Sequence, residues 1–181
     1  MPSAATQETF EILIAEDEED TREVLAEFCR SQGLQVATAA DGRAAISALE
    51  RDPLRFGAVL TDVSMPGADG FQVLQAARAG NPTIPVVIVT GYATLDSALR
   101  AVRAGAYDYL PKPFALGQLE VILTRIRERR LLERENQTLT RQMSEMGLRG
   151  GGDADHGWRL AAIEERLARI EELLKGRPGD A

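Results

Sequence analysis

Short apolar segments alternate with amphipathic segments over residues 10–114, and this alternation constrains the fold more than any other feature. Five segments have the composition of strands: residues 10–15, 34–39, 58–61, 84–89 and 106–110. The segments between them place apolar residues at helical spacing, at about residues 21–32, 42–51, 70–79 and 95–104. This alternation predicts an α/β fold, in which a five-stranded parallel sheet is covered by helices on both faces.

Local signals refine the expected boundaries and the place of two strands. Gly33 is expected to end a helix, and Asp41 is expected to cap the next one. The segment IPVVIV (84–89) is apolar throughout, which is typical of a strand buried on both faces. The segment LQVATA (34–39) alternates in the manner of an outer strand.

Polar side chains follow four of the expected strands, at the edge where ligands bind in such sheets. They are a group of carboxylates, a hydroxyl and a lysine: Glu16, Asp17, Asp62, Thr90 and Lys112. Crowded carboxylates raise one another's pKa, and a hard cation such as Mg²⁺ relieves their repulsion. A carboxylate beside Mg²⁺ can attack phosphorus, while an ammonium and a hydroxyl contact the phosphoryl oxygens. The group therefore fits acceptance of a phosphoryl group.

Charge and residue counts exclude several other classes of function. The net charge of −7 argues against non-specific nucleic-acid binding. One cysteine, Cys29, excludes an internal disulfide and a cysteine-based zinc site, and one histidine, His156, disfavours a Ser-His-Asp site. No apolar run approaches the roughly 18 residues of a membrane span, and the first residues do not resemble a signal peptide. We therefore expect a cytoplasmic protein without a membrane or nucleic-acid partner.

The pattern after Pro113 is helical and predicts a coiled-coil extension. A stripe that can pack on the sheet comes first: Leu119, Ile122, Leu123 and Ile126. A heptad seam follows, formed by Leu132, Asn136, Leu139, Met143 and Met146. A second seam is formed by Leu160, Ile163, Leu167, Ile170 and Leu174. Asn136 at a core position favours a parallel homodimer, but the second seam can equally fold back or bind another partner.

The chain is accordingly expected to have four parts. Residues 8–126 form the α/β domain, and residues 127–147 continue its last helix as a coiled coil. Residues 148–157 form a flexible Gly/Asp linker, and residues 158–175 form a C-terminal amphipathic helix.

Four segments, in this order and spacing, resemble the receiver domain of two-component response regulators. They are ILIAEDEED, LTDVSMPGADGFQVL, PVVIVTGYA and AGAYDYLPKPF, within a similarity that covers about two thirds of the chain. The resemblance implies the flavodoxin-like strand order 2-1-3-4-5. The runs TGYATLDSALRAVRAGAYDYLPKPF and RRLLERENQTL are most similar to NtrC-like receivers.

The resemblance assigns a role to each residue of the group. Asp62 is the phosphoacceptor, and the Mg²⁺ site is formed by Asp17 directly, by Glu16 through water, by Asp62 and by the Ser64 carbonyl. Thr90 and Tyr109 are the switch residues, Lys112 is the lysine of the phosphoryl site, and the Lys112-Pro113 bond is commonly cis. Ser64 and Tyr92 tune the loss of the phosphoryl group. The family more often has Asp than Glu at position 16, which concerns metal affinity.

The expected function is that of a phosphorylated switch and not of an enzyme, although such a domain assists its own phosphotransfer and slow autodephosphorylation. A histidine kinase or phosphotransfer protein would phosphorylate Asp62, and the switch would change contacts with an unidentified downstream protein. The chain has no Walker motif and too few residues for an NtrC-like output. The alternatives are a phosphorylation-independent scaffold acting through its coiled coil, or the receiver fragment of a longer NtrC-like activator. A haloacid-dehalogenase-like phosphatase is disfavoured because Ser64 replaces its second acid.

Overall fold

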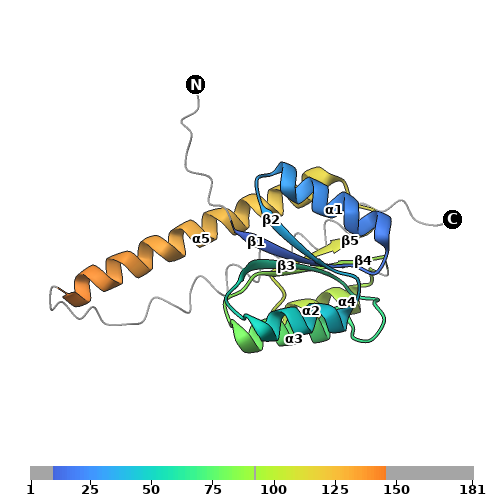
Figure 1. Cartoon of the computed structure of the whole chain (residues 1–181), viewed down its shortest axis with the longest axis horizontal. Coiled ribbons are helices and arrows are strands. Elements are labelled where there is room, and N and C mark those ends of the chain that lie inside the picture. Colours follow the sequence, from blue (N-terminus) through green and yellow to red (C-terminus); the bar gives the residue numbers. More distant parts are fainter. Residues whose placement is uncertain (1–9, 92, 146–181) are drawn as a thin grey trace, which may run out of the picture.

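A computed structural model describes residues 10–91 and 93–145, and these form an α/β domain with a projecting helix (Figure 1). The elements follow in the order β1 (Glu11–Ala15), α1 (Glu19–Ser31), β2 (Gln35–Ala39), α2 (Gly42–Arg51), β3 (Phe56–Asp62), α3 (Gly70–Gly80), β4 (Val86–Thr90), α4 (Leu95–Arg103), β5 (Asp108–Pro111) and α5 (Leu116–Glu145).

The five strands form one parallel sheet in the order β2-β1-β3-β4-β5. Helices α1 and α5 cover one face, and α2, α3 and α4 cover the other (Figure 1). The flavodoxin-like order predicted through the family resemblance is therefore confirmed. Every residue of β3 and β4 is buried, as a parallel sheet covered on both faces requires.

Several element boundaries differ from the predicted ones by two residues. Strand β3 begins at Phe56 rather than at residue 58. Strand β4 begins at Val86 rather than at residue 84, because Pro85 has no N–H group to donate to a neighbouring strand. Strand β2 is at the sheet edge, as predicted, but its burial does not alternate, since Val36 and Ala37 are both half-buried.

Side chains at the starts of α2 and α3 fix where these helices begin. The Asp41 carboxylate accepts a hydrogen bond from the Ala44 N–H (2.8 Å), which confirms the predicted cap. Asp69 and Gln72 form a reciprocal capping box at α3. Gly33 follows α1 with φ = 78°, a left-handed conformation that glycine adopts without steric cost. These caps hold the loops that follow β2 and β3.

Helix α5 packs on the sheet over its first three turns and then leaves it. Leu119, Ile122, Leu123 and Ile126 are completely buried, as the apolar stripe predicted. On the next turn three arginines donate to main-chain carbonyls: Arg127 to Gln32, Arg129 to Thr83 and Arg130 to Gly57.

Within the described residues, no helix is both long enough and apolar enough to cross a membrane.

The structure describes part of the predicted coiled-coil extension. Leu132, Asn136 and Leu139 are exposed on the projecting part of α5. The side chain of Met143 and the residues from Met146 onward lie outside the described residues. These include the predicted linker at 148–157, the helix predicted at 158–175, and its seam of Leu160, Ile163, Leu167, Ile170 and Leu174. The predicted four-part organisation therefore stays a prediction beyond the sheet domain.

We predict that Gly42→Ala lowers the free energy of unfolding by about 1–3 kcal/mol, because close packing resists added atoms. A Cβ at Gly42 would lie 2.0 Å from the Ala68 carbonyl oxygen, so α2 and the loop after β3 would have to separate. Chemical denaturation measures the change. Gly117→Ala is the matched control, since nothing lies within 4 Å of its added Cβ. Equal unfolding free energies for the two variants would contradict the predicted clash.

Candidate functional site

The carboxyl ends of four neighbouring strands bring the predicted group together. Asp62 and Thr90 are the last residues of β3 and β4, and Lys112 directly follows β5. Glu16 and Asp17 lie in the three-residue loop between β1 and α1. Because Ala15 pairs with Thr61, and Asp62 with Val89, the loop after β1 lies beside Asp62. The parallel register thus places all five residues at the carboxyl ends of the strands.

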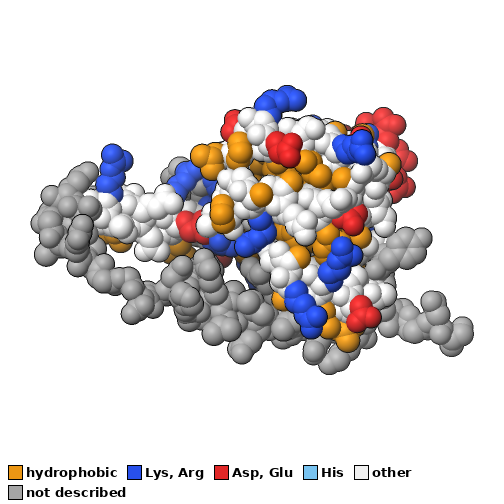
Figure 2. Space-filling view, turned by 90° about the horizontal axis from the view of Figure 1, so that it is seen from below, with side chains coloured by type: hydrophobic (Ala, Val, Ile, Leu, Met, Phe, Trp, Pro, Cys, Tyr) orange, Lys and Arg blue, Asp and Glu red, His pale blue; other side chains and the backbone are white. Residues whose placement is uncertain are grey.

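Three carboxylates form the centre of this site. One carboxylate oxygen from each of Glu16, Asp17 and Asp62 lies within 4.8 Å of the other two. Glu16 and Asp62 are buried, with 2% and 7% of their surface exposed, whereas Asp17 is exposed. Figure 2 shows acidic side chains gathered at the end of the molecule away from the free end of α5. The centre is therefore open to solvent on the Asp17 side.

Lys112 compensates part of this negative charge. Its Nζ donates to Glu16 Oε2 at 2.7 Å and lies 3.8 Å from Asp62 Oδ1. The Asp62 Oδ1 atom is buried and accepts no hydrogen bond from any described residue. An unsatisfied buried oxygen next to two more carboxylates is a donor set that fits a hard divalent cation. The site therefore fits Mg²⁺, the ion predicted from the sequence.

Burial dominates the ionisation of both buried carboxyls. Desolvation raises the pKa of Asp62, and the nearby charge of Asp17 raises it further, while Lys112 and the N–H groups of Val63 and Ser64 lower it. Desolvation likewise raises the pKa of Glu16, against the hydrogen bond from Lys112. The folded chain thus holds two carboxylates whose negative charge a bound cation would stabilise.

The predicted switch residues lie behind the carboxylates, inside the domain. Thr90 is 1% exposed, and its carbonyl accepts a hydrogen bond from the Lys112 N–H at 2.7 Å. Tyr109 is also 1% exposed, and its hydroxyl oxygen lies 2.7 Å from Ser97 Oγ on α4. The Lys112-Pro113 bond is cis, as the family resemblance implied. Thr90 and Tyr109 therefore occupy buried positions on adjacent strands.

Two residues predicted to tune phosphoryl loss differ in what the structure says of them. Ser64 is exposed in the loop after β3, next to the carboxylate centre. Tyr92 lies outside the described residues, so its predicted shielding role stays a prediction.

Residue-type patterns missed two polar partners of the site. Ser97 contacts Tyr109, and its only sequence signal is its place three residues after Thr94, which is typical of a helix cap. Arg22 donates to the carbonyls of Glu16 and Asp17, and its only signal is that it follows an acidic loop by one helical turn. The Ser97 contact depends on how α4 packs on β5, and the Arg22 contacts depend on how the loop before α1 folds against that helix.

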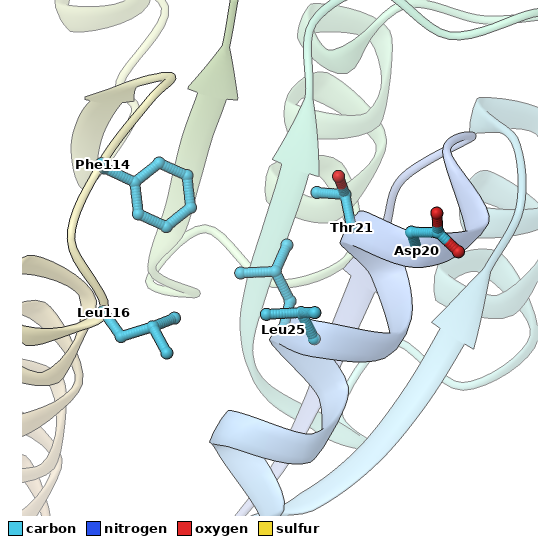
Figure 3. Close-up of a pocket in the computed structure, with 6 residues that line it drawn as sticks. Asp20, Thr21, Leu25, Phe114 and Leu116 are labelled. Atoms are coloured by element: carbon cyan, nitrogen blue, oxygen red, sulfur yellow. The ribbon is translucent and has the colours of Figure 1, made fainter.

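An open, mostly apolar groove of about 280 Å³ flanks the site (Figure 3). It lies between α1 and the segment that leads into α5, and it is lined by Asp20, Thr21, Val24, Leu25, Phe114 and Leu116. Val24 and Leu116 are 53% and 39% exposed. Because α1 follows the Asp17 loop and Phe114 follows Lys112 by two residues, the groove adjoins the carboxylate centre.

Comparisons with known proteins agree on one family. A family model described as the response regulator receiver domain matches residues 12–124. An NtrX-like response regulator of Rickettsia conorii is 30% identical over 172 residues, which cover 93% of this chain and 36% of the relative. The crystal structure of NtrX from Brucella abortus has a TM-score of 0.64 and 31% identity, covering 71% of this chain and 29% of that one. A receiver domain from Clostridium thermocellum has a TM-score of 0.64 and 27% identity over 68% of this chain and 98% of that one.

We predict that Asp62→Asn raises the free energy of unfolding at neutral pH by about 0.5–2 kcal/mol, since the amide has no charge to desolvate. The raised pKa means that the folded chain binds this proton more tightly than the unfolded chain. The stability of the wild type therefore falls as the pH rises from 3.8, the ordinary value, through the raised pKa. The advantage of Asp62→Asn should shrink as the pH is lowered towards 3.8.

Urea denaturation without divalent cations, at neutral and at acidic pH, tests this expectation. An advantage of the same size at both pH values would show that it does not come from the charge of Asp62.

Proposed function

The chain belongs to the response regulator receiver family, and on this premise we propose that Asp62 accepts a phosphoryl group from a histidine kinase or phosphotransfer protein. One observation carries the proposal: the buried Asp62 Oδ1 has no hydrogen-bond partner among the described residues and lies 3.8 Å from Lys112 Nζ. The Asp62 carboxylate thus carries an unsatisfied oxygen beside a fixed positive charge. The position of Asp62 at the carboxyl end of β3, where ligands bind in sheets of this kind, also supports the assignment.

The proposed transfer moves the phosphoryl group from a histidine nitrogen of the donor to an oxygen of Asp62. An Asp62 carboxylate oxygen forms a bond to phosphorus while the P–N bond of the donor phosphohistidine breaks, and the electron pair of that bond stays on the imidazole nitrogen. Glu16, Asp17, Asp62 and the Ser64 carbonyl would hold Mg²⁺, which when bound neutralises charge on the phosphoryl oxygens. Lys112 would exchange its contact with Glu16 for one with a phosphoryl oxygen.

The buried hydroxyls supply the proposed response to phosphorylation. Thr90 ends the strand beside β3, and this position supports the proposal that its hydroxyl donates to a phosphoryl oxygen on Asp62. Tyr109 is on the next strand, pairs with Ile88 and contacts Ser97 of α4. A shift of Thr90 towards the phosphoryl group would thus change the packing under α4 and the contacts that the α4–β5–α5 surface makes with a downstream protein.

The groove of Figure 3 is the proposed docking place of the phosphodonor protein. The donor histidine must approach Asp62 from solvent, and the groove adjoins the exposed Asp17 side of the site. Its exposed Val24 and Leu116 would receive an apolar helix face, with Asp20 at the rim.

The exposed seam on α5 supports a proposed homodimer. Leu132 and Leu139 are 58% and 55% exposed and seven residues apart, so they repeat on one side of the helix. Asn136 lies between them at a core-type position, where pairing with its copy satisfies both amides in a parallel dimer. A second copy of the chain is therefore the occupant that this side of α5 fits best.

We expect the wild type to gain one phosphoryl group on incubation with acetyl phosphate and Mg²⁺, measured by intact mass. Asp62→Asn should gain none, because it lacks the nucleophilic oxygen. Lys112→Ala should be labelled about 100-fold more slowly, since it lacks the charge that stabilises the transition state.

Asp52→Asn, an exposed aspartate at the end of α2, is the control and should be labelled as the wild type is. A folded wild type that is neither labelled nor binds Mg²⁺ would overturn the proposal and support the phosphorylation-independent scaffold.

We expect the double variant Leu132→Lys, Leu139→Lys to sediment as a monomer at concentrations where the wild type is a dimer, because charges would enter the seam. Leu131→Lys is the matched control: Leu131 is 49% exposed but lies off the seam, so this variant should stay dimeric. Equal effects of the double variant and of Leu131→Lys would show that the seam is not the interface.

A further inference from the structure

We propose that Arg22 is a positioning residue for the cation site, acting through the backbone of Glu16 and Asp17. The inference rests on the proposed function, because it concerns the same carboxylates. Arg22 is not one of the predicted site residues, and its side chain does not belong to the carboxylate centre. It contacts the loop that supplies two of the three carboxylates.

One nitrogen of the guanidinium group makes both contacts. Arg22 Nη1 donates to the Glu16 carbonyl at 2.8 Å and to the Asp17 carbonyl at 3.2 Å. The donor is on the first turn of α1, and the two carbonyls belong to consecutive residues of the loop before it. The pair of hydrogen bonds therefore fixes two consecutive peptide groups relative to the helix.

Fixing these peptide groups also fixes the directions of the two carboxylates. The Glu16 side chain is held separately, because Oε2 accepts from Lys112 Nζ at 2.7 Å and Oε1 accepts from the Glu18 N–H at 3.4 Å. Asp17 is exposed, and no such side-chain contact is described for it. The hydrogen bond from Arg22 to its carbonyl is thus the described contact that restrains Asp17 most directly.

The charges of this loop and of the start of α1 favour such a restraint. Residues 16–23 contain six carboxylates and one basic residue, which is Arg22. Mutual repulsion of the carboxylates favours an expanded loop, and the loop has only three residues between β1 and α1. Partners that orient metal ligands in this way typically contribute about 10–100-fold to metal affinity.

A simpler electrostatic effect predicts the opposite result. A positive charge near a cation site weakens binding of the cation, so loss of Arg22 would strengthen it if charge alone mattered. Positioning predicts weaker binding after loss of the donor. The sign of the change in Mg²⁺ affinity therefore separates the two effects.

The test is an amide NMR titration of the full chain with Mg²⁺, for the wild type, Arg22→Met, Arg22→Lys and Arg30→Met. We expect Arg22→Met to raise the dissociation constant about tenfold. Arg22→Lys keeps a charged donor and should stay within about threefold of the wild type. Arg30→Met removes the same charge from the last turn of α1 and should bind as the wild type does.

Two further measurements distinguish a positioning role of Arg22 from a loss of stability of the whole domain. Without Mg²⁺, amide exchange at residues 17 and 18 should be about tenfold faster in Arg22→Met, while exchange in β3 and β4 is unchanged. With acetyl phosphate, half-saturation should need about tenfold more Mg²⁺, but the labelling rate at saturating Mg²⁺ should stay within about twofold.

Equal or tighter Mg²⁺ binding by Arg22→Met would overturn the inference while leaving the proposed function intact. Equal weakening by Arg22→Met and Arg30→Met would also overturn it, because the loss of affinity would then not depend on the contacts of Arg22 with the Glu16 and Asp17 carbonyls. A wild type that binds no Mg²⁺ would overturn the proposed function and this inference together. If Arg22→Met does not fold, Arg22→Gln, with the same readouts, replaces it.

Discussion

The crowding of carboxylates around one ammonium group is the constraint on which the arrangement of this molecule depends. In a parallel sheet the carboxyl ends of adjacent strands lie side by side. The residues that follow four of these strands therefore meet, whether or not their charges attract one another. Lys112 satisfies Glu16 directly and lies farther from Asp62. The remaining negative charge is held in place by the covalent and packing requirements of the sheet, and its cost to stability is the physical reason why the site fits a cation.

The sequence was sufficient to predict the sheet, its flanking helices and the residues at the strand ends. These predictions depend on periodicity and on the rule that strand ends meet, and both are local or topological properties. Side-chain partners across elements were not predictable in the same way. Ser97 and Arg22 are ordinary helix residues by spacing, and only the packing of α4 on β5, and of α1 on its loop, gives their donors a partner. The burial of β2 was also missed, because its surroundings and not its own alternation determine it.

Helix α5 connects the domain to the exposed seam without a break in the helix. Its apolar stripe ends at Ile126, and Arg127 and Arg130 then attach the next turn to carbonyls at the end of α1 and the start of β3. Arg130 also lies 5.0 Å from the centre of the Phe10 ring. The projecting part of α5 therefore has a direction fixed by the domain, and a change in the domain would reorient the seam as one piece.

Helix α4 differs from α5 in how it is held. Its completely buried side chains are two alanines, Ala98 and Ala101, so apolar burial stabilises it little. Two further contacts hold this helix. Ser97 Oγ is hydrogen-bonded to the Tyr109 hydroxyl, and the Arg100 guanidinium lies 3.9 Å from the centre of the Phe71 ring. Such contacts can exchange partners without opening the core, unlike the leucine and isoleucine packing under α5. The domain thus combines a helix with little buried apolar surface, α4, with one held by a continuous apolar stripe, α5.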